Sequence, residues 1–315
     1  MSALRSEQSA ILPRLAMGCA TFGGVGSLTE LLGHGDSKDV AFASMDAAWE
    51  GGIHWFDTAD AYGGGLSEQW IGEWIAATGH CPKIATKTYN PMPPTHDSGL
   101  SRERILRQID SSLARLGIER VDLYLAHEFD PVTPIVETFA VFEELVDEGT
   151  IGAYGVSNFT AEQLQAAVDG GAPSVVQNSY SLLNRRDELD VIPLANANGI
   201  TYQAYSPLAG GWLSGKYRAG EPMPPESRLA LAPQWYEHID EARAFRGLAA
   251  MEELAAAEGT SVAALALGWV LAQRDTAGIV VGPRRAEHFA PVWAARSDDL
   301  QREVVSELTS VFALD

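Results

Sequence analysis

Cysteine is scarce in this chain. Of its 315 residues only Cys19 and Cys81 are cysteines, and they form no CxxC pair, so a disulfide framework is excluded. Long hydrophobic runs are also missing, because no apolar stretch approaches the roughly 18 residues that a membrane-spanning helix needs. Residues 1–8 lack the basic and then apolar pattern of a secretory signal. We therefore expect a cytoplasmic protein with no membrane role.

Positive charge is in short supply as well. The chain carries 22 Lys and Arg against 42 Asp and Glu, a formal net charge of -20. An acidic surface repels phosphate backbones, so we expect no nucleic-acid partner. Any anionic cofactor must then be held by local basic side chains and backbone amides.

Several functional motifs are absent. The chain has no G-x-G-x-x-G, which is the phosphate-binding fingerprint of Rossmann domains, and no G-x-S-x-G nucleophile elbow. Its seven histidines show no HxH, HExxH or clustered spacing. We therefore expect no metal site.

Strand-like and helix-like patterns alternate along the whole chain, which is 46% hydrophobic and can bury a large core. The segments predicted as strands are 15–19, 54–57, 83–87, 121–127, 151–156, 174–177, 201–205 and 278–281. Those predicted as helices are 37–50, 67–77, 101–116, 132–148, 161–169, 187–198 and 261–274. Repeated βα units with short connections predict a single (β/α)8 TIM barrel domain over residues 1–315. An open doubly wound sheet is the second possibility.

The main irregular stretch is residues 218–236, which contains four prolines. It follows the seventh predicted strand and so belongs to the carboxyl end of the barrel. Long loops in compact domains often act as lids. We expect a lid-like loop over a cofactor or substrate, with a plain surface excursion as the alternative.

Polar residues stand at or just after three successive predicted strands: Asp57, Lys87 and His127, with Tyr62 five residues after Asp57. A free Tyr is a weak acid that titrates near pH 10, and a neighbouring Lys cation lowers its pKa. A carboxylate keeps that Lys charged and in place. A His can hydrogen-bond a substrate oxygen or share the Tyr proton. The set indicates a tuned general acid over a carbonyl, which also needs a hydride-donating cofactor.

The order of the motifs resembles the aldo-keto reductase family. The stretch from Asp57 to Gly63 reads DTADAYG and is followed by GLSE at 65–68. Lys87 in IATK and His127 in LYLAH fit the remaining catalytic positions of that family. Asp60, within the first motif, is interpreted as a turn residue. The resemblance runs from about residue 15 to about residue 285, which is most of the chain.

The resemblance implies an NADPH-dependent reduction of an aldehyde or ketone to an alcohol. Tyr62 would donate the proton, Lys87 held by Asp57 would lower its pKa, and His127 would orient the carbonyl. Some relatives are redox-sensing regulatory subunits that bind the cofactor, and others reduce keto or enoyl sugars in deoxysugar pathways. The same four residues would serve in each case, so these alternatives stay open.

The resemblance also implies a cofactor site spread over four strand ends. Ser157, Asn158 and Gln177 follow the fifth and sixth strands and would hold the nicotinamide carboxamide. Tyr205 after the seventh strand would stack on the nicotinamide face. The loop that would cover the pyrophosphate comprises Ser206, Pro207, Leu208, Gly210, Gly211 and Lys216. Its GGWLSGKY stretch narrowly misses a P-loop, because the last position is Tyr217 and not Ser or Thr.

Gly282, Arg284 and Arg285 follow the eighth strand. Guanidinium groups suit phosphate recognition, so the arginines predict the 2′-phosphate of NADP(H), with NADH as a possible substitute. The Glu-Asn pair that often holds adenine in the family is replaced here by Pro291-Val292. His288 is expected to compensate.

Aromatic residues that follow strands are expected to line a substrate pocket at the barrel mouth. They are Phe22, Tyr89, Phe129, Trp212 and, in the lid-like loop, Trp235. They predict an apolar or flat carbonyl substrate, such as an aromatic aldehyde, a ring ketone or a sugar. The sequence does not name that substrate, and it leaves the oligomeric state open.

Overall fold

The structure is a computed structural model that describes residues 12–93, 95–297 and 300–313. Eight parallel strands form a closed barrel in chain order, with β8 pairing back onto β1. They are β1 (Leu15–Gly18), β2 (Trp55–Asp57), β3 (Lys83–Thr88), β4 (Val121–Ala126), β5 (Ile151–Ser157), β6 (Val175–Ser179), β7 (Thr201–Tyr205) and β8 (Gly278–Val281). The predicted (β/α)8 barrel is confirmed. The open doubly wound sheet was the wrong alternative, because the strand pairs close into a ring.

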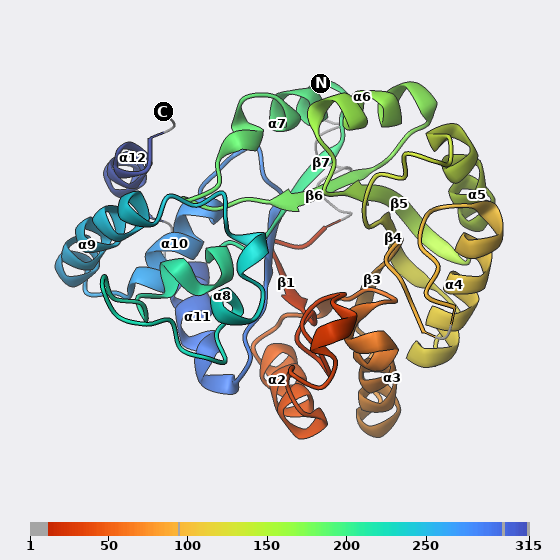
Figure 1. The fold of residues 1–315 in the computed structure, drawn as a ribbon, viewed down its shortest axis with the longest axis horizontal. Coiled ribbons are helices and arrows are strands. Elements are labelled where there is room, and N and C mark those ends of the chain that lie inside the picture. Colours follow the sequence, from red (N-terminus) through yellow and green to blue (C-terminus); the bar gives the residue numbers. More distant parts are fainter. Residues whose placement is uncertain (1–11, 94, 298–299, 314–315) are drawn as a thin grey trace.

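Helices surround the strands, and α9 to α12 gather on one side of the molecule (Figure 1). They are α2 (Lys38–Glu50), α3 (Leu66–Thr78), α4 (Arg102–Leu116), α5 (Ile135–Asp147), α6 (Ala161–Gly170), α7 (Val191–Ala197), α8 (Arg228–Leu231), α9 (Glu241–Glu258), α10 (Val262–Leu271), α11 (Ala290–Ser297) and α12 (Arg302–Val311). Short 3-10 helices occupy connections: η1 (Thr29–Leu31), η2 (Tyr62–Gly65), η3 (Arg186–Glu188), η4 (Ala209–Ser214), η5 (Pro233–Trp235) and η6 (Ala286–Phe289).

Helix ends follow local signals. Gly79 and Gly117 end α3 and α4 with φ of 73° and 66°, a left-handed conformation that glycine adopts without strain. Thr160 begins α6 with a capping box, in which its side chain and that of Gln163 each bind the other residue's backbone N–H. Ser101 stands at the predicted start of α4, but its side chain accepts no capping hydrogen bond.

Four helices lie outside the predicted set: α8, α9, α11 and α12. The longest, α9, has clear end signals, since the Asp240 side chain caps its start and Gly259 ends it. Its middle is rich in alanine and lacks a clear apolar stripe, so periodicity does not reveal it.

The interior of the barrel is apolar in one part and polar near the carboxyl ends of the strands. A small apolar cluster that includes Ala16, Ala85 and Leu123 fills the interior, separate from the larger core between strands and helices. Toward the carboxyl ends, Asp57 of β2 and Gln177 of β6 meet directly across the barrel through a 2.8 Å hydrogen bond. Polar side chains therefore form the floor beneath the strand ends.

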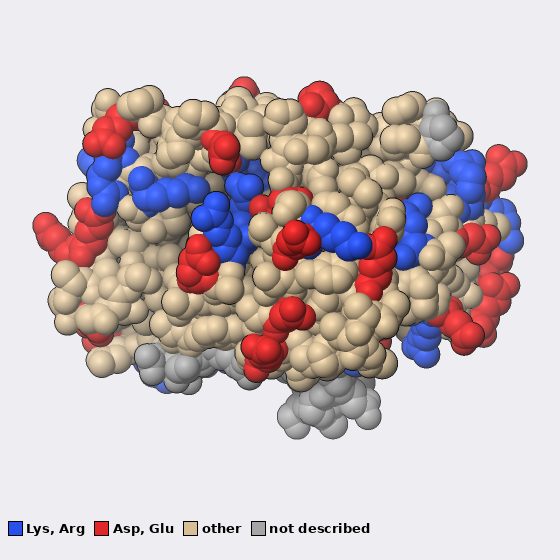
Figure 2. Space-filling model, turned by 90° about the horizontal axis from the view of Figure 1, so that it is seen from below, with Lys and Arg blue, Asp and Glu red and all other residues tan. Residues whose placement is uncertain are grey.

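In the part of the chain that the structure describes, no single helix is both long and apolar enough to cross a membrane, although α9 and α10 meet that test together as a pair bent by 92°. Figure 2 shows one face of the molecule, on which basic and acidic side chains are interspersed between uncharged areas.

Candidate active site

Lys87 and Asp57 form a buried ion pair at the carboxyl end of the barrel. Lys87 Nζ lies 2.5 Å from Asp57 Oδ1 and donates to the Thr58 carbonyl at 2.9 Å. The two side chains are 1% and 5% exposed, so solvent ions screen the pair little. The second Asp57 oxygen accepts from Gln177 Nε2 at 2.8 Å, which leaves both carboxylate oxygens bound.

Tyr62 begins η2, the turn that follows β2. Residues 63–65 are glycines with φ of 58°, 66° and 98°, which L side chains rarely adopt, so this turn requires glycine. The turn brings the Tyr62 hydroxyl 3.4 Å from His127 Nε2. Lys87 Nζ lies 5.2 Å from the centre of the Tyr62 ring. The structure thus brings together all four residues that the sequence analysis predicts as catalytic.

The expectation that Lys87 lowers the pKa of Tyr62 is not met. Burial, and next the charge of Asp57, raise the pKa of Tyr62 well above its ordinary value, and the main cation that lowers it is Arg228. Lys87 is bound to Asp57 and lies over the ring rather than at the hydroxyl, so its charge is largely offset. The phenol is therefore protonated at neutral pH and has a proton to donate.

His127 is a neutral imidazole. Burial, and then the charge of Lys87, lower the pKa of His127 well below its ordinary value. Its backbone N–H donates to the Thr88 carbonyl at 3.0 Å, and its carbonyl accepts from Asn158 Nδ2 at 2.9 Å. Its Nδ1 lies 3.1 Å from Asn90 Nδ2, a contact that the sequence analysis does not predict.

Two buried acids lie behind the site. Asp60 and Glu68 are fully buried, with Arg104 Nη2 at 3.9 Å from Asp60 Oδ2 and Arg115 Nη2 at 2.7 Å from Glu68 Oε2. Burial, and then the charge of Glu68, raise the pKa of Asp60 to about 7. Asp60 is thus more than a turn residue. The sequence does not reveal this network, because its partners come from separate elements.

The predicted carboxamide site after β5 and β6 is tightly hydrogen-bonded. Ser157 Oγ donates to the Gln177 carbonyl at 2.8 Å. Asn158 has a φ of 60°, its Nδ2 donates to Glu128 Oε1 at 3.0 Å, and its Oδ1 accepts from the Tyr205 hydroxyl at 2.6 Å. Burial raises the pKa of Glu128 to about 7, although the bond from Asn158 opposes the shift. Glu128 is a further residue of this site that the sequence analysis does not predict.

The predicted segment after β7 forms a tight turn that comprises Tyr205, Ser206, Pro207, Leu208, Gly210, Gly211 and Lys216. Ser206 and Ala209 have φ of 55° and 47°, and Gly210 and Gly211 follow with φ of 66° and 99°. Residues in such sparsely populated conformations often cluster at ligand sites. A Cβ added to Gly211 would lie 2.9 Å from Lys216 Nζ, so Lys216 packs against the turn.

The predicted residues after β8 are Gly282, Arg284, Arg285 and His288. Arg284 Nε is 2.9 Å from Asp36 Oδ1, and its Nη1 donates to the Glu226 carbonyl at 3.3 Å. Arg285 is 68% exposed. His288 Nδ1 accepts from the Arg284 backbone N–H at 3.3 Å. Arg284, which follows β8, thus binds residues of the connections after β1 and after β7. Its anionic partner is Asp36.

Residues 218–236 contain α8 and lie against the connections that follow β1 and β7. A Cβ added to Gly26 would be 2.8 Å from the Trp235 ring, and one added to Gly210 would be 2.3 Å from the Tyr236 ring. The segment thus contacts the connections after β1 and β7. Its role as a lid stays a prediction.

Arg228 on α8 is a basic residue that the sequence analysis missed. Its guanidinium lies 5.3 Å from the Trp235 ring, and its charge lowers the pKa of Tyr62 and of Tyr236. Within the described ranges, no acidic side chain forms an ion pair with Arg228. The only signal in the sequence is its position as a cation inside the proline-rich loop.

The predicted pocket aromatics divide into two groups. Phe22 and Trp212 are 1% and 5% exposed and belong to the hydrophobic core. Tyr89 and Phe129 are half-buried, and Trp235 is 36% exposed. Contact with a substrate stays a prediction for all five, but only the last three present appreciable surface in this structure.

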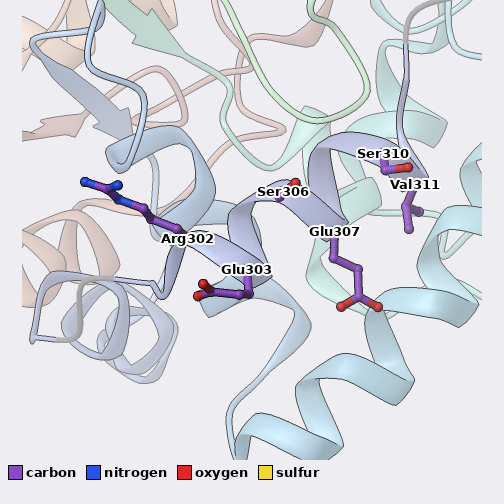
Figure 3. A pocket seen from close by; sticks show the side chains of 6 residues that line it. All are labelled: Arg302, Glu303, Ser306, Glu307, Ser310 and Val311. Carbon is purple, nitrogen blue, oxygen red and sulfur yellow. The ribbon is translucent and has the colours of Figure 1, made fainter.

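The described residues outside this site form a surface hollow but no cluster of metal ligands. Among the residues described, no three His, Cys, Asp or Glu side chains converge as a metal site would require. A surface hollow lies on the outer face of α12 (Figure 3) and is lined by Arg302, Glu303, Ser306, Glu307, Ser310 and Val311. All six come from one exposed helix, and none belongs to the predicted site.

The residues around the mouth fit an anionic nicotinamide cofactor. Lys216, Arg228 and Arg284 lie on the connections after β7 and β8, in a chain of net charge -20. Burial, and then the charge of Arg284, lower the pKa of Lys216, which indicates that these cations repel one another. Bound phosphate would relieve that repulsion. The turn at 209–211 would let backbone approach such a group closely.

The sequence is similar to known oxidoreductases along most of its length. The family model described as "Aldo/keto reductase family" matches residues 14–313. An uncharacterized oxidoreductase, YrpG of Bacillus subtilis, is 33% identical over 293 residues, which cover 87% of each chain. An aldo-keto reductase yakc [NADP(+)] of Schizosaccharomyces pombe is 30% identical over 280 residues, covering 86% of this chain and 82% of that protein.

The fold also matches a solved structure. The glycerol dehydrogenase AKR11B4 of Gluconobacter oxydans superposes with a TM-score of 0.81 and 27% sequence identity. The match covers 95% of this chain and 91% of that one.

Proposed function

The chain belongs to the aldo-keto reductase family, and from this premise we propose that it is an NADPH-dependent reductase that converts an aldehyde or ketone into an alcohol. Membership of the family makes it an oxidoreductase that uses a nicotinamide cofactor. The preference for NADPH, the role of each residue and the substrate class are our proposals.

One observation supports the proposal most strongly. Asp57, Lys87 and His127 come from the ends of β2, β3 and β4, and Tyr62 comes from the turn after β2. The Tyr62 hydroxyl, the His127 ring and the Lys87–Asp57 pair occupy one place at the barrel mouth. A neutral phenol beside a neutral imidazole is suited to meet a carbonyl oxygen and to protonate it.

The roles follow from this geometry. When bound, NADPH supplies the hydride that adds to the carbonyl carbon. Tyr62 donates its proton to the oxygen, and the Lys87 ammonium, which Asp57 holds 5.2 Å from the centre of the Tyr62 ring, lies beside the phenolate that is left. His127 positions the carbonyl oxygen. Ser157, Asn158, Gln177 and Tyr205 hold the nicotinamide end of the cofactor.

The cofactor preference rests on the cations of the barrel mouth. We assign Lys216 and Arg228 to the pyrophosphate, and Arg284 and Arg285 to the 2′-phosphate that distinguishes NADPH from NADH. The guanidinium suits phosphate because it offers several N–H donors in a fixed geometry. The relative from Schizosaccharomyces pombe that carries NADP(+) in its name supports the same choice.

The substrate is proposed as a small carbonyl compound with an apolar or flat body, because Tyr89, Phe129 and Trp235 present aromatic surface near the mouth. A redox-sensing subunit or a keto-sugar reductase would use the same four residues. A cytoplasmic location stays a prediction from the sequence.

Titration of the purified protein with NADPH and with NADH, followed by protein fluorescence, tests the proposal. Tight binding of NADPH and weak binding of NADH is the expected result. Equal affinities would remove the 2′-phosphate assignment and leave the reductase. Failure to bind either cofactor would overturn the proposed function.

A further inference from the structure

The two ring nitrogens of His127 have different partners. Nε2 faces the Tyr62 hydroxyl at 3.4 Å, whereas Nδ1 faces Asn90 Nδ2 at 3.1 Å. A neutral imidazole has one nitrogen that donates a hydrogen bond and one that accepts. An amide nitrogen can only donate. If Asn90 Nδ2 donates to Nδ1, then Nδ1 is the acceptor and the ring proton is on Nε2.

Asn90 is held firmly in place. It follows β3 by two residues, and its backbone carbonyl accepts a hydrogen bond from Arg104 Nη2 at 2.6 Å. Arg104 is 2% exposed and also donates to Thr88 Oγ1 at 2.7 Å and to the Gly99 carbonyl at 3.0 Å. The residue after Asn90 is Pro91, which restricts the Asn90 backbone to extended conformations. The amide therefore meets His127 from a fixed backbone.

The position of the ring proton decides between two roles of His127. With the proton on Nε2, the imidazole donates a hydrogen bond toward Tyr62 and the substrate oxygen. With the proton on Nδ1, Nε2 would be a lone pair that accepts the Tyr62 proton. The sequence leaves both roles open. Titratable groups around the ring are Lys87 on β3, Tyr62 on the turn after β2 and the adjacent Glu128.

We propose that Asn90 is a positioning residue that holds His127 in the tautomer with its proton on Nε2, so that His127 donates a hydrogen bond to the carbonyl oxygen. This inference rests on the proposed carbonyl reduction. In the proton balance, the hydroxyl proton of the product alcohol comes from Tyr62, and the phenolate regains a proton from solvent. His127 keeps its own proton throughout.

The tautomer can be read directly, without turnover. Protein labelled with 15N-histidine gives long-range 1H–15N spectra that distinguish a protonated ring nitrogen from a bare one, and the His127→Gln variant identifies the signals of His127. In the wild type we expect a bare Nδ1, a protonated Nε2 and no titration between about pH 5 and 8. A protonated Nδ1 in the wild type would overturn the proposal.

Asn90 variants test the cause. Asn90→Asp places an acceptor-only carboxylate against Nδ1, so it should shift the proton to Nδ1 and bring the His127 titration into the same pH range. Asn90→Leu, which adds no charge, should give a mixture of tautomers and serves if the aspartate variant folds poorly. An unchanged tautomer in both variants would contradict the role of Asn90.

Kinetics provide the second readout. With 4-nitrobenzaldehyde as probe, and at a pH above the His127 titration of the variant, Asn90→Asp should lower kcat roughly a hundredfold, as expected for loss of one donor to a developing oxyanion, and should leave the Kd for NADPH unchanged. Asn196→Asp, on the exposed surface of α7, adds the same charge away from the strand ends and should behave as wild type. Equal kcat in wild type and Asn90→Asp would contradict the proposal. If the protein reduced no carbonyl, the spectra would still decide the tautomer.

Discussion

Lys87 Nζ and Asp57 Oδ1 lie 2.5 Å apart, and both side chains are almost completely buried. Asp57 is also bound by Gln177 from the opposite side of the barrel. The pair therefore has a part in the proposed chemistry, and it also links β2 to β3. The hydrogen bond from Gln177 links β2 to β6.

Removing one partner of this pair should destabilise the fold. Lys87→Met leaves the Asp57 carboxylate buried and unpaired, so we expect the free energy of unfolding to fall by roughly 3–5 kcal/mol. The double variant Asp57→Asn/Lys87→Met should recover at least half of that loss, because no buried charge remains. Denaturant unfolding of the two variants and the wild type measures both effects. A double variant as unstable as Lys87→Met would contradict the explanation.

Glu128 should give the cofactor affinity a pH dependence. Its pKa is raised to about 7 by burial, so the side chain is neutral below that pH and negative above it. We expect affinity for NADP+, whose nicotinamide ring is positive, to increase relative to NADPH as the pH rises through about 7. Titrations at several pH values measure this ratio. Glu128→Gln should abolish the change, and persistence of the change in that variant would assign it to another group.

The ion pair between Arg284 and Asp36 should oppose binding of the 2′-phosphate. Arg284→Ala should lower the affinity for NADPH roughly ten- to a hundredfold, which is the usual contribution of a hydrogen bond to a charged group, and should leave the affinity for NADH nearly unchanged. Asp36→Asn removes the anionic partner of the Arg284 guanidinium and should raise the affinity for NADPH. Asp110→Asn removes the same charge from the exposed face of α4 and is the control. Equal effects on both cofactors would place the 2′-phosphate elsewhere.

Arg104 should contribute strongly to the stability of the fold. It is 2% exposed and binds the carbonyls of Asn90 and Gly99 and the Thr88 hydroxyl. Arg104→Met leaves these acceptors and the nearby Asp60 without the Arg104 cation. We therefore expect the free energy of unfolding, measured with denaturant, to fall by roughly 3–5 kcal/mol. A loss below about 1 kcal/mol would indicate that other donors, such as Gln108, satisfy the network.

The sequence predicts the barrel well because its strands are short apolar runs with polar residues at their ends. Asp57, Lys87 and His127 are recognisable for that reason, since parallel strand ends meet at one edge of the barrel. The helix α9 escapes prediction because its alanine-rich surface shows little periodicity, although Asp240 and Gly259 mark its ends.

Residues that depend on contacts between distant elements cannot be found this way. Asn90 is an ordinary loop residue until β4 places His127 beside it. Arg228 is one cation in a proline-rich loop until that loop lies near Tyr62. The pKa of Tyr62 also differs from the expectation, because burial and the charge of Asp57 raise it and the main cation that lowers it is Arg228.

A single-turnover measurement tests the central claim most directly. The protein is saturated with NADPH and mixed rapidly with excess 4-nitrobenzaldehyde, and oxidation of the bound cofactor is followed by its absorbance. The wild type should oxidise NADPH, whereas Tyr62→Phe should bind it with unchanged affinity and react roughly a hundred- to ten-thousandfold more slowly. Equal rates in the two proteins, or no oxidation by the wild type with a panel of reactive aldehydes, would contradict the account.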